Sequence, residues 1–395
     1  MTDLPEINVG VVGHIDHGKT TLLSKLTGKF ADTHSEELKR GITIKLGYAE
    51  TIISEKDKKF NNKGEGKPVR YVSFIDAPGH EMLMATMLSG AASFDAAILV
   101  IAANEGIKPQ TKEHFMALQA KIIKNIIVVQ NKIDLVTKEK AIQNYQEIKK
   151  LLKGTIAENA PIIPVSAQQE INIDKIFEEL VKIEVPKREK DSEPIFLIAR
   201  SFDINRPGKE IQKLNGGVLG GILKKGKLSV NDEIEIKPGK LIIKNNQKTY
   251  QTIYTKIKSI QKGNESVKEV FPGASIAIET ELDPTLTKTD SLTGCIVSKK
   301  GVLPEITSKM KLNINLFDKM IQQNTEEKIP ELKTKEMIML SVDTTITVGV
   351  VEKINKDGTV EFSLNLPVIA LKGENVGLAR NIAGHWRLIG FGEIL

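Results

Sequence analysis

The residues with the clearest chemical potential run from Gly13 to Thr20, with the sequence GHIDHGKT. They follow the apolar run Ile7–Val12 and precede a helical pattern. A strand, a glycine-rich turn and a helix start in this order form a P-loop, whose backbone N–H groups can wrap a phosphate chain. Lys19 would reach the β and γ phosphates, and the Thr20 hydroxyl would bind Mg²⁺. The expected phosphate contacts from this loop are Gly13, Asp16, His17, Gly18, Lys19, Thr20 and Thr21.

A second polar motif, Asp76-Ala77-Pro78-Gly79, follows the apolar run Tyr71–Ile75. A carboxylate at this place can hold Mg²⁺, through water because this ion keeps part of its hydration shell. The backbone N–H of Gly79 would meet a γ phosphate. An Asp-Pro-Gly cluster after a strand is by itself a common turn. Its position after a P-loop favours the metal and phosphate role.

A third and a fourth motif predict which base is bound. Asn131-Lys132-Ile133-Asp134 follows an apolar run, and the Asp134 carboxylate can accept hydrogen bonds from the N1–H and the 2-amino group of guanine. Adenine offers neither donor on that edge, so a buried carboxylate left unpaired would reject it. Asn131 and Lys132 would brace the loop and cover the base. Ser166-Ala167 follows the next run, where the Ala167 N–H could meet guanine O6. GTP is therefore favoured over ATP.

Strand-like runs alternate with helical stretches through the first half of the chain, which indicates a mostly parallel, doubly wound sheet. Ligands bind such sheets at the carboxyl ends of the strands. Four of the five runs end in one of the polar motifs above. The runs are Ile7–Val12, Val72–Ile75, Ala96–Ala103, Asn125–Val129 and Pro161–Val165.

The strings GHIDHGKT, RGIT (Arg40–Thr43) and DAPGH (Asp76–His80) resemble those of the translational GTPases, the group that contains elongation factor Tu. The resemblance implies that Thr43 completes Mg²⁺ coordination only when the γ phosphate is present, so hydrolysis would release its loop. It also implies that His80 positions the attacking water. The sequence shows no arginine finger, so intrinsic hydrolysis should be slow and stimulated by partners.

Longer strings narrow the resemblance to the gamma subunits of archaeal and eukaryotic translation initiation factor 2, with the archaeal form nearer. They are SEELKRGITIKLGYA, GHEMLMATMLSGA, GTIAENAPIIPVS, ARSFDINRPG, GGVLGG and HWRLIG, spread over nearly the whole chain. The resemblance implies a heterotrimer with alpha and beta subunits, delivery of initiator methionyl-tRNA to the small ribosomal subunit, and its release after GTP hydrolysis.

One departure from that family is plain. Its members usually carry paired Cys-x-x-Cys elements that form a zinc knuckle, whereas the corresponding segment here, residues 54–68, has no cysteine or histidine. Zinc cannot be held there by the usual ligands, so no zinc is expected. The lysine-rich, glycine-interrupted composition predicts a mobile hairpin tip. A solvated loop is favoured there, and contact with RNA stays open as the alternative.

The second half of the chain begins with a charged, proline-bracketed linker, Pro186–Pro194. Short β-branched runs then follow at close spacing, and the pattern restarts near Pro304. This predicts two small β-barrels of six or seven strands. The predicted domains are residues 1–190 for nucleotide binding, 194–303 for the first barrel and 304–395 for the second.

Composition limits the alternatives. The net charge of +6 is weak evidence for RNA, and the single cysteine, Cys295, excludes an internal disulfide and a thiolate metal cluster. No signal peptide or membrane-length apolar run is evident, so we expect a cytoplasmic protein without a membrane partner. Tyr48, beyond the switch threonine, is a candidate for stacking on tRNA, although an ordinary strand aromatic is as plausible.

The motifs predict a site for Mg²⁺ with GTP or GDP, and the resemblance implies a GTP-gated carrier of initiator methionyl-tRNA. Three alternatives stay open. An elongation-type carrier would not prefer initiator tRNA. A GTPase subunit of a metabolic enzyme such as sulfate adenylyltransferase would ignore tRNA. A nucleotide-binding scaffold would release no phosphate.

Overall fold

We analysed a computed structural model, which describes residues 4–28, 46–78, 84–206, 208–244, 247–317, 319–322 and 325–395. The chain divides into two compact units. The first comprises Met1–Pro186, Leu316–Pro330 and Ala379–Phe391, and the second Lys187–Asn315, Glu331–Leu378 and Gly392–Leu395. The division into three domains at residues 190 and 303 stays a prediction.

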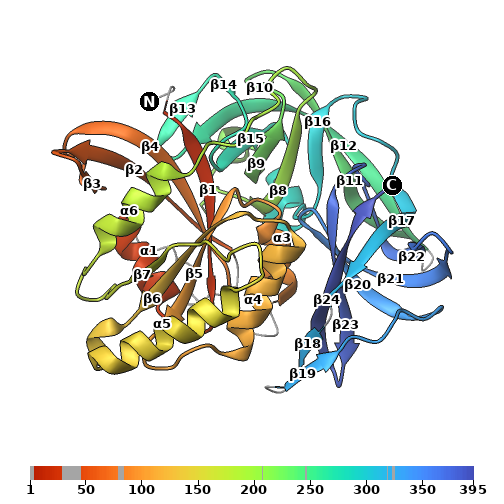
Figure 1. The fold of residues 1–395 in the computed structure, drawn as a ribbon. Coiled ribbons are helices and arrows are strands. Elements are labelled where there is room, and N and C mark those ends of the chain that lie inside the picture. Colours follow the sequence, from red (N-terminus) through yellow and green to blue (C-terminus); the bar gives the residue numbers. More distant parts are fainter. Residues whose placement is uncertain are drawn as a thin grey trace. The chain divides into compact units, whose positions relative to one another are not determined.

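The first unit is built on a seven-stranded sheet in the order β3-β2-β4-β1-β5-β6-β7. The five strands β4, β1, β5, β6 and β7 are parallel to one another. At one edge of the sheet, β2 runs antiparallel to β4, and β3 runs antiparallel to β2 (Figure 1). The predicted, mostly parallel sheet is confirmed, and β2 and β3, which form the predicted hairpin, add antiparallel strands that the sequence analysis did not assign to this sheet. The strands are β1 (Glu6–Gly13), β2 (Gly47–Lys56), β3 (Lys59–Asn61), β4 (Lys67–Asp76), β5 (Ala96–Ala102), β6 (Asn125–Asn131) and β7 (Ile162–Pro164).

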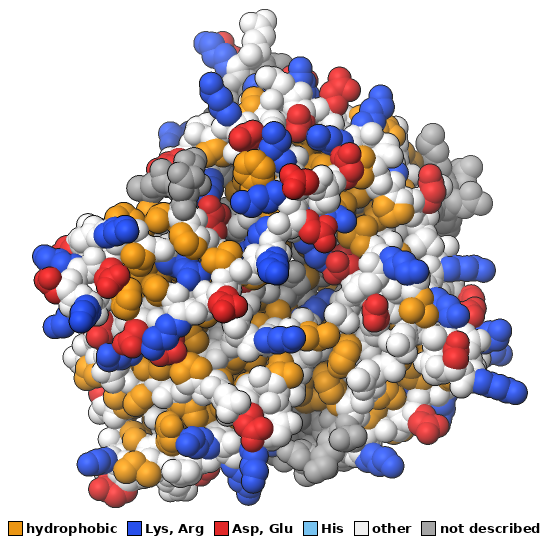
Figure 2. Space-filling view, turned by 45° about the horizontal axis from the view of Figure 1, so that its top comes forward, with side chains coloured by type: hydrophobic (Ala, Val, Ile, Leu, Met, Phe, Trp, Pro, Cys, Tyr) orange, Lys and Arg blue, Asp and Glu red, His pale blue; other side chains and the backbone are white. Residues whose placement is uncertain are grey.

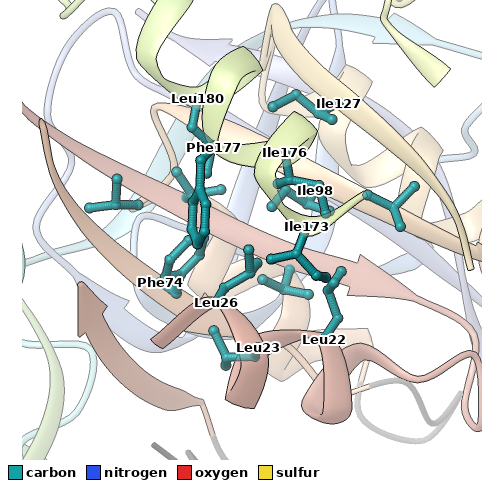
Figure 3. Packing of buried hydrophobic residues seen from close by; sticks show 14 of the residues in the cluster. Leu22, Leu23, Leu26, Phe74, Ile98, Ile127, Ile173, Ile176, Phe177 and Leu180 are labelled. Atoms are coloured by element: carbon teal, nitrogen blue, oxygen red, sulfur yellow. The ribbon is translucent and has the colours of Figure 1, made fainter. Parts of the chain in front are cut away.

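Helices cover both faces of this sheet, as Figure 1 shows. They are α1 (Lys19–Thr27), α3 (Met84–Ala91), α4 (Pro109–Ala120), α5 (Lys138–Leu152) and α6 (Ile173–Lys182). On one face, α1 and α6 pack on the apolar side chains of the sheet, and Figure 3 shows Phe177 of α6 beside Phe74 of β4. On the other face, Gln130 of β6 donates hydrogen bonds to Ala141 and Asn144 of α5. Because it is covered on both sides, β5 is apolar and buried at every position.

Residues 54–68 contain the predicted hairpin. The turn between β2 and β3 has Asp57 and Lys58 at positive φ, 51° and 60°. The Asn62 amide donates to the carbonyl oxygens of Lys25 and Leu26, which ties the segment to the C-terminal end of α1. The hairpin is therefore confirmed, while its mobility and its solvation stay predictions.

The second unit contains a sheet that closes on itself. Its order is β11-β16-β8-β9-β15-β12-β13, and β11 also pairs with β12, which closes six of the strands into a barrel. Glycines permit the close packing, since a Cβ at Gly221 would lie 1.9 Å from the carbonyl oxygen of Leu197. Cys295 is buried in this barrel's core, and burial raises the pKa of its thiol to about 11. The strands are β8 (Ile195–Phe202), β9 (Val218–Lys225), β11 (Glu233–Lys244), β12 (Gln247–Lys262), β13 (Glu265–Val267), β15 (Ile276–Thr280) and β16 (Ile296–Lys299).

A second closed barrel follows near the end of the chain, with the strand order β17-β22-β21-β20-β23-β24. Both predicted barrels are therefore confirmed, each with six strands in its closed circuit. These strands are β17 (Thr307–Leu316), β20 (Met337–Val342), β21 (Thr345–Ile354), β22 (Thr359–Val368), β23 (Asn375–Ile382) and β24 (His385–Ile394). Smaller pieces are β10 (Leu228–Ser229), β14 (Glu269–Val270), β18 (Lys319–Gln322), β19 (Thr325–Lys328) and the 3₁₀ helices η2 (Ile133–Leu135), η3 (Ile211–Lys213) and η4 (Pro284–Asp290).

Candidate nucleotide-binding site

The P-loop lies between β1 and α1, as the sequence predicts. Gly13 ends β1 with φ 143°, and an added Cβ would lie 2.3 Å from the carbonyl oxygen of Val100 on β5. Gly18 caps α1 in the left-handed region with φ 86°. The chain can therefore turn tightly here only because these positions lack a side chain. The backbone N–H groups at the start of α1 carry the positive end of the helix dipole, which favours a bound anion.

Lys19 and Thr20 begin α1, and both have partners in the protein. The Lys19 ammonium donates to the carbonyl oxygen of His14 at 2.8 Å, and Lys19 is 6 % exposed. The Thr20 hydroxyl donates to Oδ2 of Asp76 at 3.0 Å, although the two residues are 56 positions apart. A hydroxyl and a buried carboxylate placed together are hard oxygen donors, and they fit Mg²⁺. The chain thus brings two of its three predicted metal ligands together.

Asn131, at the end of β6, is the connecting residue of the site. Its side-chain N–H donates to the carbonyl oxygen of His17 at 3.0 Å, and its Oδ1 accepts from the backbone N–H of Ala167, also at 3.0 Å. Both hydrogen bonds are buried. One amide therefore joins the P-loop to the Ser166-Ala167 turn. We expected the Ala167 N–H to donate to guanine O6. In the structure it donates to Oδ1 of Asn131, so a bound base would have to share this hydrogen with Asn131.

Asp134 and Lys132 are more open than Asn131. Asp134 lies in η2 and is exposed. Its carboxylate can select guanine over adenine only if the bound base covers it. Lys132 is in the left-handed region with φ 60°, and its ammonium lies 3.5 Å from Oε1 of Glu105. Ser166 is fully buried, and its Oγ accepts from the backbone N–H of Gln169.

Three histidines at the phosphate site are buried or half-buried: His14 and His17 belong to the P-loop, and His114 lies on α4. The Gly13 N–H donates to Nδ1 of His114, on α4, at 2.9 Å, and His17 Nδ1 lies 3.3 Å from the carbonyl oxygen of Val100. Burial lowers the pKa of His17 and of His114 to about 3, and it also lowers the pKa of His14. All three rings are therefore neutral near pH 7, and no histidine charge competes with Lys19 for a phosphate.

Some predicted residues cannot be placed. Thr43, Gly79 and His80 lie outside the described residues. Thr21, in the first turn of α1, and Asp16, with φ 59°, are in the P-loop region as expected. Tyr48 lies on β2 in register with Ile75 and is half-buried.

The sequence patterns missed His114 and Glu105. Both follow β5, the one predicted strand to which no polar motif was assigned. The carboxyl end of β5 lies between the carboxyl ends of β1 and β6, where the ligand of such a sheet binds. Its position could therefore have indicated that residues after β5 contribute to the site. The sequence could not identify His114 itself, because a histidine within a helical pattern does not show which backbone N–H group will donate to its ring.

Comparison with known proteins identifies the family. Residues 5–186 match the model described as the elongation factor Tu GTP binding domain, and residues 308–394 match that described as initiation factor eIF2 gamma, C terminal. The chain is 48 % identical over 405 residues to translation initiation factor 2 subunit gamma of Archaeoglobus fulgidus, covering 99 % of this chain and 95 % of that protein. It is 49 % identical over 404 residues to the same subunit of Methanococcus vannielii, with 99 % and 98 % covered.

Solved structures agree on the architecture. A bacterial selenocysteine-specific elongation factor superimposes with a TM-score of 0.77 at 26 % identity, over 99 % of this chain and 58 % of its own. Elongation factor SelB from Methanococcus maripaludis, in complex with the GTP analogue GPPNHP, gives 0.74 at 26 % identity, over 100 % of this chain and 80 % of its own. Among the described helices, none has the length and apolar character needed to cross a membrane. The chain therefore belongs to the family of translation initiation factor 2 gamma subunits, which are translational GTPases.

Proposed function

We propose that this protein binds initiator methionyl-tRNA in its GTP form, carries it to the small ribosomal subunit, and releases it after GTP hydrolysis. The observation that supports the proposal is the convergence of four separate motifs at the carboxyl ends of the parallel strands. Asn131 joins three of them, and the hydrogen bond from Thr20 to Asp76 joins the fourth to the P-loop. The names of the curated relatives supply the initiation role. The useful output of the reaction is a difference in tRNA affinity between two nucleotide states.

The proposed nucleotide site has a phosphate half and a base half. The phosphates would contact the P-loop residues from Gly13 to Thr21 together with Gly79, and guanine would contact the third and fourth motifs. Mg²⁺, held by Thr20 and Thr43 and through water by Asp76, would neutralise charge on the transferred phosphoryl group. The hydrogen bond from Thr20 to Asp76 supports this placement.

His80 is the proposed catalytic residue, which would orient the attacking water. His80→Ala is expected to slow GTP hydrolysis by roughly 10²- to 10³-fold while GTP affinity changes less than twofold, because a water-positioning group acts mainly on the transition state. Single-turnover phosphate release, measured with and without ribosomes, checks this. An unaltered rate would remove His80 from the mechanism. The intrinsic rate of the wild type is proposed to be slow, since the sequence offers no arginine finger.

The proposed partners are alpha and beta subunits, in a cytoplasmic heterotrimer, and Tyr48 is a proposed tRNA contact.

Over the face of the molecule in Figure 2, lysine and arginine side chains are interspersed with aspartate and glutamate. The net charge of +6 is therefore spread rather than gathered on that face. RNA binding there would depend on specific contacts more than on a uniform basic field.

The carrier role can be tested by protection of the aminoacyl ester from spontaneous hydrolysis. The complex with the alpha subunit is mixed with methionylated initiator tRNA and either a GTP analogue or GDP, and methionylated elongator tRNA is the matched control. Protection limited to initiator tRNA and the GTP form is expected. Equal protection of elongator tRNA would favour an elongation-type carrier, which the selenocysteine-factor structures keep as the rival. Absence of protection would favour a metabolic GTPase.

A further inference from the structure

A cluster of metal-binding side chains lies at the phosphate loop, whose expected contacts with phosphate are made by backbone N–H groups, so the imidazole rings of this cluster have no assigned role in the proposed GTPase chemistry. His14 and His17 come from the P-loop, and Glu105 comes from the segment between β5 and α4. Each offers one ligand atom, and the three atoms lie within 4.8 Å of one another. In the part of the chain that the structure describes, this is the one such group that was found.

The two histidines present nitrogens that lack a hydrogen-bond partner. Because a carbonyl oxygen only accepts, His17 Nδ1 must carry the proton that it shares with Val100, which leaves a lone pair on Nε2. Nε2 of His17 and Nδ1 of His14 are both buried, with no hydrogen-bond partner among the described residues. His17 is 0 % exposed. An unsatisfied buried polar atom costs about 1–3 kcal/mol, so an ion that takes the lone pair of His17 Nε2 would be stabilised there.

The donor types select the kind of ion. Two imidazole nitrogens and one carboxylate oxygen suit Zn²⁺, whereas Mg²⁺ requires an all-oxygen shell. In tetrahedral Zn²⁺ sites neighbouring ligand atoms are about 3.4 Å apart, as follows from bond lengths near 2.0–2.1 Å. Separations of up to 4.8 Å would therefore need to shorten by up to about 1.4 Å, which side-chain rotation and a small movement of the loop can supply. The fourth position would be left to water.

Glu105 can be released to such an ion at low cost. Its Oε1 lies 3.5 Å from the Lys132 ammonium, and its Oε2 lies 3.9 Å from the Lys108 ammonium. Both pairs are partly exposed, so each contributes at most about 1 kcal/mol. The nearby ammonium groups repel a divalent cation, however, so we expect affinity in the micromolar range rather than that of a structural zinc site.

We propose that His14, His17 and Glu105 form a binding site for Zn²⁺, separate from the Mg²⁺ position at Thr20 and Asp76. The ion would join the phosphate loop to the segment after β5, and it would take Glu105 from Lys132 in the guanine-binding motif. This site is independent of the zinc knuckle that residues 54–68 lack, because none of the three proposed ligands lies in that segment.

The test uses the untagged, full-length chain, stripped of nucleotide and metal. Zn²⁺ binding is measured by competition with a chromophoric zinc chelator, and Co²⁺ absorption reports on the ligands. We expect one ion per chain, with affinity at least tenfold weaker in His17→Asn and in Glu105→Gln. Millimolar Mg²⁺ should not displace the ion. Glu105 is half-exposed, so its variant keeps the test decisive even if His17→Asn does not fold.

His385, on β24 and not part of the cluster, supplies a matched control. His385→Asn should bind Zn²⁺ as the wild type does. The proposal fails if the wild type binds no Zn²⁺ at micromolar concentration, if the His17 and Glu105 variants bind normally, if a control substitution abolishes binding, or if Mg²⁺ displaces the ion.

Discussion

The phosphate loop and the guanine-binding loop of the same site are built differently. Around the phosphates, the key groups are buried and already hydrogen-bonded within the protein: His17, Lys19 and Asp76 are 0 %, 6 % and 0 % exposed. On the base side, Asn131 is buried, but Asp134 is exposed and Lys132 is half-exposed. The phosphate half is therefore preorganised by the fold, whereas the base half is completed by the nucleotide. Substitutions of the buried, hydrogen-bonded residues, Asn131 included, should change stability, and substitutions of the exposed base-side residues should change specificity.

The largest expected effect is on specificity. Asp134→Asn should lower GTP affinity by about 10³-fold or more, because a carboxylate that pairs with two guanine donors is lost, and it should raise the preference for xanthosine triphosphate. Calorimetric titration of both nucleotides checks this. The free energy of unfolding should change by less than about 0.5 kcal/mol, since the side chain is exposed. Unchanged base preference would sink the assignment of Asp134.

Asn131→Ala should instead act on stability. Removing the amide leaves the Ala167 N–H and the His17 carbonyl oxygen buried without their partner, which should cost about 3 kcal/mol. Urea unfolding of the nucleotide-free protein measures this. A loss below about 1 kcal/mol would mean that water replaces the amide, and the two loops would then not be linked as described.

Mild acid should also weaken the phosphate half. The pKa of His17 and of His114 is lowered to about 3 by burial, against about 6.5 in the unfolded chain. Between these values the unfolded state binds more protons, so stability is complete above pH 6.5 and falls as the pH is lowered. From pH 7 to 5.5 the loss should be about 2.5 kcal/mol for the two rings together. Urea unfolding at both pH values tests this, and His114→Gln should remove about half of the pH dependence.

The smallest effect is expected for Lys132→Ala, the matched neighbour of Asn131→Ala. The ion pair of Lys132 with Glu105 is partly exposed, so its loss should change the free energy of unfolding by less than about 1 kcal/mol. The same urea experiment measures both variants. If Lys132→Ala destabilised the protein as much as Asn131→Ala, the guanine loop would be as preorganised as the phosphate loop and the contrast would disappear.

The sequence alone determined the P-loop, the motifs at the strand ends and the two barrels. Each depends on a local pattern: glycines at positions where a Cβ would collide, β-branched runs between turns, and an acidic residue directly after a strand. It predicted the hairpin but did not place β2 and β3 in the sheet, because a partly polar strand at a sheet edge has a weak hydrophobic pattern. It also did not show that Asp134 is exposed in the absence of a bound base.

Only the tertiary structure decided which polar groups meet. The hydrogen bonds from Thr20 to Asp76, from Asn131 to His17, and from Gly13 to His114 join residues 56, 114 and 101 positions apart. No local pattern encodes such pairs, because they depend on strand order and on how deeply each side chain is buried. The sequence thus named the groups that can bind a guanine nucleotide, and the packing of the sheet and its helices set which of them are held in place beforehand.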